Sequence, residues 1–211
     1  MSETLQEGIW KQGFGKAYTD RNTFDNDTLD RLYVEDIGIS RTQMNEDFIG
    51  SLDRNIRILE VGSNIGLQLI NLQKMGFTNL YGIELQPDAV EKSKDKTNGI
   101  NIIQGTAYDL PFKDGYFDLV FTSRVLIHLN PNNIDTAINE IIRCSNKYVY
   151  GNEYFNEELV EILNYHGETE ICWKRDFPKL FSDKGLTLIR EQKYKYTFND
   201  DIDTTYLLEK L

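Results

Sequence analysis

Apolar runs and amphipathic stretches alternate along most of the chain after residue 55. The apolar runs have the length and the branched side chains of buried strands, and they predict strands at 55–61, 79–85, 100–104, 116–122 and 147–154. The stretches between them space their apolar positions as helices do. They predict helices over 65–75, over 87–97 and from Asn130 onward, with Asn130 as N-cap and Pro131 as first helical residue.

The C-terminal part continues this pattern with a predicted helix near 176–184 and a strand over 185–192. A last strand, 204–211, would be added at an edge of the sheet. Alternation of strands and helices implies a mostly parallel sheet with helices on both faces. Ligands of such sheets bind beyond the carboxyl ends of the strands, so the loops that follow the first five strands are expected to form the site.

The first 50 residues have a different pattern, helical but irregular. Trp10, Phe14 and Tyr18 follow one another at helical spacing, although Gly13 and Gly15 weaken the helix. The aromatic stripe allows two interpretations, a lid over a ligand or a helix packed on the core. We predict an N-terminal helical cap over 1–50 and one compact domain over 51–211.

The first candidate ligand-binding residues lie in the loop after the first strand, within ILEVGSNIG (58–66). Gly62 permits a tight turn and a close approach by a ligand, and the helix that follows offers free N–H groups and a positive dipole end. A dinucleotide fingerprint would have a further glycine, and here Asn64 stands in the turn. Asn is acceptable there because it adopts left-handed backbone more readily than most residues.

Two carboxylates narrow the ligand class. Glu60 precedes the loop, where an acid suits a cationic ligand better than a pyrophosphate. Glu84 ends the second strand and can accept both hydroxyls of a ribose, while Leu85 can pack on an adenine face.

These pieces resemble the class I S-adenosylmethionine (SAM)-dependent methyltransferases. The matching strings are EVGSNIG (60–66), IEL (83–85), GTAYDLPF (105–112) and FDLVFTSRVLIHL (117–129), in the family's order. The resemblance implies a Rossmann-like α/β fold with a mostly parallel seven-stranded sheet, helices on both sides and an N-terminal helical lid. It also implies SAM as cofactor, S-adenosylhomocysteine (SAH) as product and the following cofactor residues: Tyr18, Asn22, Glu60, Gly62, Ser63, Asn64, Glu84, Leu85, Gln86, Gly105, Thr106, Ala107 and Ser123. Thr106 stands where the family often has Asp.

Strings outside this core resemble the methyltransferases associated with pseudaminic acid biosynthesis. They are EGIWKQGFGKAYTDRN (7–22), VLIHLNP (125–131), YHG (165–167) and WKRDF (173–177). This second resemblance implies a sugar or nucleotide-sugar acceptor from nonulosonic acid and surface-glycan synthesis. The acceptor residues that we predict are His128, Tyr154, His166, Lys174 and Arg175. Lys174 and Arg175 beside Trp173 suit an anionic sugar, and surface cations paired with nearby acids are the alternative.

Methyl transfer to a hydroxyl or amine requires that the acceptor is positioned and that a base removes its proton. The chain has two histidines, and His128 follows the fourth strand, where the acceptor should meet the methyl group. We predict that His128 is the base, with His166 as a second candidate. A purely structural, hydrogen-bonded His128 remains the alternative.

Composition narrows the remaining possibilities. The net charge of −11 argues against a duplex nucleic-acid partner. We expect no membrane span, no secretory signal and no metal site, and Cys144 and Cys172 are expected as two core thiols in a cytoplasmic protein. Three other functions stay open: methylation of another small metabolite, NAD-dependent oxidoreduction, and SAM binding without chemistry.

Overall fold

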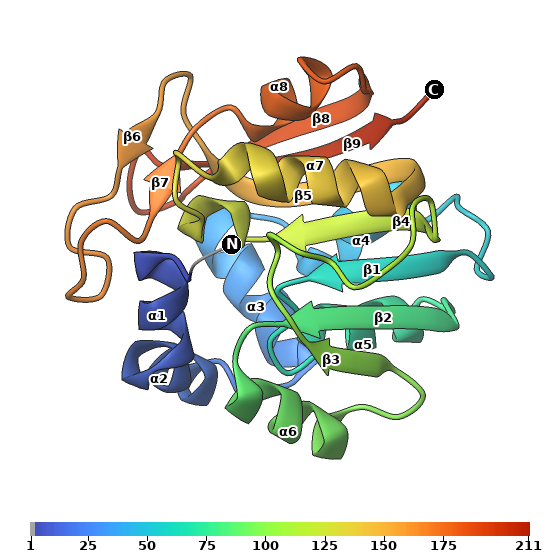
Figure 1. Cartoon of the computed structure of the whole chain (residues 1–211), viewed down its shortest axis with the longest axis horizontal. Helices are drawn as coiled ribbons and strands as arrows, with labels where there is room; N and C mark the ends of the chain where they lie inside the picture. The colour runs from blue at the N-terminus through green and yellow to red at the C-terminus, as the bar shows by residue number, and fades with distance from the viewer. Residues whose placement is uncertain (1–2) are drawn as a thin grey trace.

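Seven strands of the computed structural model, which describes residues 3–211, form one sheet (Figure 1). They are β1 (Arg57–Val61), β2 (Asn79–Glu84), β3 (Asn101–Gln104), β4 (Phe117–Ser123), β5 (Ser145–Phe155), β8 (Thr187–Lys195) and β9 (Ile202–Glu209). The strand order is β3-β2-β1-β4-β5-β9-β8. The first five are parallel, and β9 runs antiparallel to both β5 and β8. A separate two-stranded hairpin consists of β6 (Val160–Glu161) and β7 (Trp173–Lys174).

Helices cover both faces of this sheet, as Figure 1 shows with α7 in front and with α4 and α5 behind. The helices are α1 (Leu5–Lys11), α2 (Gly13–Arg21), α3 (Asn26–Ile37), α4 (Arg41–Ile49), α5 (Leu67–Lys74), α6 (Pro87–Lys96), α7 (Ile134–Cys144) and α8 (Phe177–Ser182), with a 3-10 turn η1 (Leu126–His128). On one face, Ile138 of α7 and Phe177 of α8 pack with Val120 of β4. On the other, Leu69 of α5 packs with Ile58 of β1. The two cores explain why the central strands β1 and β4 are buried along most of their length.

The predicted fold class is confirmed, and each of the five predicted parallel strands is present, with ends that differ from the prediction by at most two residues. The predicted position of the last strand is wrong. Strand β9 lies inside the sheet, where Tyr206 pairs with Gly151 of β5 and with Glu191 of β8, and β8 forms the edge. The burial pattern agrees with this, since β9 is buried along most of its length whereas β8 is mostly exposed.

The predicted helix start at Asn130 is also wrong, because α7 begins at Ile134. The Asn130 side chain accepts the N–H of Asn132 at 2.9 Å, and its carbonyl accepts the N–H of Asn133 at 2.9 Å. Asn favours such local turns over helix, so residues 130–133 form a turn that precedes the helix. The apolar face predicted for this helix, which includes Ile134, Ile138 and Ile141, is buried as expected.

The N-terminal segment contains four helices whose ends follow from local sequence. Thr4 and Glu7 form a capping box at the start of α1, and the helix ends at Gln12, which separates it from α2. Gly38, with φ of 79°, ends α3. Helices α3 and α4 contribute to the cores around the sheet, whereas α1 and α2 lie together across the ends of the central strands (Figure 1).

Candidate active site

One cavity of about 340 Å³ lies at the carboxyl ends of β1, β2, β3 and β4. Its size is within the usual range of small-molecule sites, and its position is the one that a parallel sheet provides. All the predicted cofactor residues line it: Tyr18, Asn22, Glu60, Gly62, Ser63, Asn64, Glu84, Leu85, Gln86, Gly105, Thr106, Ala107 and Ser123. The loops after four of the predicted strands therefore meet around one space.

The loop between β1 and α5 turns through three left-handed residues. Gly62, Asn64 and Gly66 have φ of 76°, 47° and 84°. Asn64 therefore adopts the left-handed backbone expected for it, and its side chain accepts the N–H of Ile65 at 2.8 Å. A Cβ atom on Gly62 would lie 2.5 Å from a methyl carbon of Val125, so no other residue fits this position without movement of its neighbour.

Glu84 at the end of β2 joins two of the cavity loops. Its carboxylate accepts the N–H of Asn64 at 2.7 Å and the N–H of Gln86 at 2.8 Å. Burial raises its pKa, and these backbone hydrogen bonds offset part of the rise. Each carboxylate oxygen has a second lone pair free to accept from a ligand, so the predicted contact with ribose hydroxyls is chemically available.

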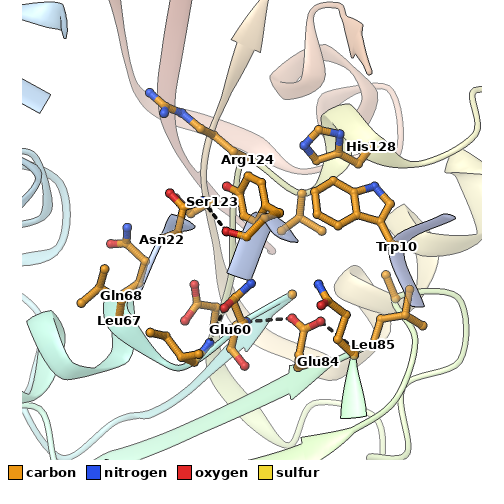
Figure 2. Close-up of a pocket in the computed structure, with 18 of the residues that line it drawn as sticks. Trp10, Asn22, Glu60, Leu67, Gln68, Glu84, Leu85, Ser123, Arg124 and His128 are labelled. Atoms are coloured by element: carbon orange, nitrogen blue, oxygen red, sulfur yellow. Dashed lines mark hydrogen bonds between the residues drawn. The ribbon is translucent and has the colours of Figure 1, made fainter. Parts of the chain in front are cut away.

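Glu60 provides the cavity with an unsatisfied acceptor (Figure 2). Its side chain is 2% exposed, and Oε2 has no hydrogen-bond partner among residues 3–211. Burial raises its pKa well above the usual value, and the charge of Arg41 lowers it in part. A buried, unpaired carboxylate oxygen beside a cavity fits a ligand that donates hydrogen bonds and carries positive charge, as the ammonium group of SAM does.

Helices α1 and α2 close the cavity and are bonded to three of its loops. Thr106 Oγ1 donates to Glu7 Oε1 at 2.6 Å, and Asn64 Nδ2 donates to Thr19 Oγ1 at 2.9 Å. Thr19 Oγ1 also donates to Gln86 Oε1 at 3.3 Å. The rings of Phe14 and Tyr18 each lie 5.1 Å from that of Trp10, and Trp10 lines the cavity.

His128 lies on η1 at the same cavity and is 7% exposed (Figure 2). Its Nδ1 is 2.7 Å from the carbonyl oxygen of Ile171. A carbonyl can only accept, so Nδ1 carries the proton and Nε2 is left as an acceptor. Burial lowers the pKa of His128 to about 4, with a further decrease from His166, and the bond to Ile171 offsets part of this. The ring is therefore neutral at neutral pH.

The other predicted acceptor residues do not line the cavity. Tyr154 on β5 lies beside Arg124, with the guanidinium carbon 5.5 Å from the ring centroid. His166 is exposed in a turn after Tyr165, with φ of 51°. Lys174 forms an ion pair with Asp201, which matches the surface pairing named as its alternative. Arg175 follows β7, outside the cavity.

Several cavity residues were not predicted as site residues, although one of them, Arg124, lies within the matched string FDLVFTSRVLIHL. Tyr33 and Asp36 come from α3, and Gln68 comes from α5. Arg124 follows β4, with its guanidinium bonded to Asp203 Oδ2 at 2.8 Å and to the Tyr196 hydroxyl at 2.8 Å. Helical periodicity in α3 predicts an inward face, yet only the fold shows that part of this face borders a cavity.

No group of three or more His, Cys, Asp or Glu side chains lies together as a metal site within residues 3–211. None of the helices in that range combines the length and apolar character needed to cross a bilayer. Both cysteines are free and buried, as predicted.

Comparison with known proteins agrees with this geometry. A family model described as a methyltransferase domain matches residues 59–147, from β1 into β5. An uncharacterized methyltransferase of Synechocystis is 27% identical over 150 residues, which cover 65% of this chain and 70% of that protein. Norajmaline N-methyltransferase of Rauvolfia serpentina is 29% identical over 94 residues, which cover 42% of this chain but only 32% of that enzyme.

The fold has a full-length counterpart among solved structures. Magnesium protoporphyrin IX methyltransferase of Synechocystis, solved with bound SAH, superimposes with a TM-score of 0.71 over 100% of both chains at 14% identity. At that identity the likeness concerns the fold. Residues 59–147 thus carry a methyltransferase domain, and the fold around it is that of class I SAM-dependent methyltransferases, which indicates SAM as the cofactor.

Proposed function

We propose that this chain transfers a methyl group from SAM to a sugar or nucleotide sugar of nonulosonic acid and surface-glycan synthesis. One observation carries the proposal: segments far apart in the sequence, which share the resemblance to that methyltransferase family, contact one another around His128. Trp10 lies 4.6 Å and Tyr165 lies 5.2 Å from the His128 ring, measured between ring centroids. Strand β7, which begins with Trp173, packs against η1.

The cofactor half of the site would use the acids already described. Glu60 would accept from the ammonium group, Glu84 from the ribose hydroxyls, and Thr106 and Ala107 would border the adenine. When bound, SAM supplies an electrophilic methyl group on a sulfonium sulfur. The protein then has to place an acceptor atom in line with that methyl group, which is where most of the rate gain in such transfers arises.

His128 would hold the acceptor through Nε2. Because Ile171 fixes the proton on Nδ1, Nε2 faces its partner as a hydrogen-bond acceptor and can take the proton of a hydroxyl or amine. With a pKa of about 4, the ring is in the correct protonation state through the neutral range. The same low pKa gives it a small driving force for proton transfer, so orientation of the acceptor is the larger part of its role.

The charges around the cavity favour an acceptor that carries an amino group. Glu60 and Glu84 are assigned to SAM and Glu7 accepts from Thr106, so Asp36 is the acid of the lining that is left for the acceptor. Arg124, the cation of the lining, is paired with Asp203. Burial raises the pKa of Asp36, and the Arg124 charge offsets part of that rise. An amino sugar satisfies both this charge pattern and the carbohydrate proposal. An amine of another metabolite class is the second candidate, since two relatives are named N-methyltransferases.

The test is a labelling experiment with methyl-labelled SAM. The chain is incubated with nucleotide sugars and free sugars in matched pairs, one member with a free amine and the other N-acetylated. We expect label on a carbohydrate, with preference for the free amine. Label that appears only on metabolites without a sugar overturns the carbohydrate proposal and leaves the methyltransferase in place.

A further inference from the structure

The segment after β4, residues 124–128, forms one wall of the cavity and carries His128. It also packs against the first cofactor loop, because a methyl carbon of Val125 lies 2.5 Å from the position that a Cβ on Gly62 would take. The N–H of His128 donates to the carbonyl of Val125 at 2.9 Å and closes the turn η1. A displacement of this short segment therefore changes the position of the proposed base.

The side chain of Glu153, on β5, binds the backbone of this segment. Its side chain has no exposed surface, and its two oxygens accept different backbone groups. Oε1 accepts the N–H of Val125 at 3.2 Å, and Oε2 accepts the N–H of Ile127 at 3.4 Å. The one carboxylate thus reaches both the residue that starts the turn and the residue that precedes His128.

Burial of the Glu153 carboxylate without a cation beside it costs free energy. Burial raises the pKa of Glu153 to about 7, hydrogen bonds from Thr122 and the backbone lower it, and no ion pair with a cation of residues 3–211 contributes. A buried acid is tolerated where hydrogen bonds satisfy it, and those bonds in turn fix the groups that donate them. Here the donors are the backbone of the turn that presents His128.

We propose that Glu153 is a positioning residue that sets the orientation of His128 by holding the backbone N–H groups of Val125 and Ile127. The inference rests on the proposed role of His128 as the base. Arg124, at the start of the same segment, is held separately by Asp203, so loss of Glu153 would free residues 125–128 and leave Arg124 in place. The Nδ1 bond to Ile171 would then lose its fixed geometry.

Nuclear magnetic resonance of the imidazole nitrogens tests this directly, because the chain has two histidines. In a His166→Gln background, where His128 is the sole histidine, a ¹⁵N-histidine spectrum reports its tautomer. Glu153→Gln is the test variant: it keeps size but replaces one acceptor oxygen by an amide that donates. Glu157→Gln, at an exposed position shortly after β5, is the matched control.

We expect a single Nδ1-protonated tautomer in the background protein and in Glu157→Gln, and a mixed or shifted tautomer signal in Glu153→Gln. A Glu153→Gln spectrum that superimposes on the control in a folded protein overturns the proposal. If Glu153→Gln does not fold, the background protein is titrated from pH 5.5 to 8.5. The His128 signals should then move as Glu153 ionises near pH 7, and signals that stay constant overturn the proposal.

The other titratable groups near Glu153 do not interfere with that titration. Burial raises the pKa of Cys172 to about 12 and raises that of Tyr206 well above its usual value. Once an acceptor is known, Glu153→Gln should lower kcat roughly 10- to 100-fold with little change in KM for SAM. Full turnover by His128→Ala would refute the role of His128 as the base. It would not decide the role of Glu153, which the tautomer measurement tests separately.

Discussion

Glu60 and His128 both lie buried beside the cavity, and burial moves their pKa values in opposite directions. Removal from water disfavours the charged form of each, so the carboxyl pKa rises and the imidazole pKa falls. A cationic ligand would lower the pKa of Glu60 again, because the ionised carboxylate then gains a partner. For His128 the neutral form is the useful one, with a single nitrogen left to accept.

Replacement of Glu60 by Gln should weaken SAM binding about 10- to 100-fold, because a hydrogen bond to a charged partner contributes about 1.5–3 kcal/mol. Calorimetric titration with SAM measures the change. Glu91→Gln, on the exposed surface of α6, is the control and should bind as the unchanged protein does. Equal affinity in Glu60→Gln would remove Glu60 from the cofactor site.

His128 should also make stability depend on pH. Its pKa is about 4 when folded and near 6.5 when unfolded, so between these values the unfolded chain binds more protons. The contribution is therefore present above pH 6.5 and is lost as the pH falls towards 4, by up to about 3 kcal/mol. Glu153 acts in the opposite sense. Its pKa is raised, so its contribution to the stability of the folded protein is lost as the pH rises through 7.

Urea unfolding at pH 7 and pH 4.5 isolates the histidine effect. The stability difference between the unchanged protein and His128→Gln should be smaller at pH 4.5 than at pH 7. The Glu153 contribution is the same in both proteins and cancels in the difference. A difference that is constant with pH would show that His128 is not buried as a neutral ring.

Individual residues of the cofactor site were predictable because short motifs place them on successive strand ends. Gly62, Glu84 and Thr106 each follow a recognisable apolar run. Asp36 and Arg124 were not predictable as a pair, since the first comes from a helix and the second from the loop after β4. Their proximity depends on how α3 packs against α4 and α5, which no local pattern specifies.

At the scale of elements, we expect α1 and α2 to act as a lid, because their hydrogen bonds go to three different loops. The sequence suggested either a lid or a core helix, and Trp10 and Tyr18 indeed face the cavity while the stripe divides at Gln12. The turn at Asn130 and the interior position of β9 were missed. The first depends on a side-chain hydrogen bond, and the second on strand order, which apolar runs alone do not encode.

Thr106→Val should loosen this lid, since it removes the hydroxyl that donates to Glu7. Hydrogen exchange of the α1 and α2 amides should become faster, by roughly 5- to 10-fold for the loss of about 1 kcal/mol. Thr187→Val, on the exposed edge strand β8, should leave that exchange unchanged. Unchanged exchange in Thr106→Val would mean that the bond to Glu7 does not hold the lid.

At the scale of the molecule, helices α3 and α4 are joined to the sheet by shared cores. Phe48 and Ile49 of α4 pack with Ile58 and Leu69, and Tyr33 and Met44 pack with Tyr196. The predicted boundary at residue 50 stays a prediction. The packing leads us to expect that α3 and α4 unfold with the sheet, and that only α1 and α2 open separately.

Calorimetry should therefore show one main unfolding transition that SAH shifts upward. Ligand at 100 times its Kd adds about 2.7 kcal/mol, which for a chain of this size corresponds to roughly 5–10 °C. NAD at the same concentration should produce no shift. Two separate transitions, with only one moved by SAH, would contradict the view of a single cooperative unit.

The central claim is that this cavity binds SAM and presents an acceptor to Nε2 of His128. The most direct measurement compares SAH affinity with methyl transfer in the unchanged protein and in His128→Ala, with the acceptor found by labelling. The account predicts an SAH affinity within a few-fold of the original and a transfer rate lower by roughly 100-fold or more. Near-normal transfer by His128→Ala, with SAH binding intact, would contradict it.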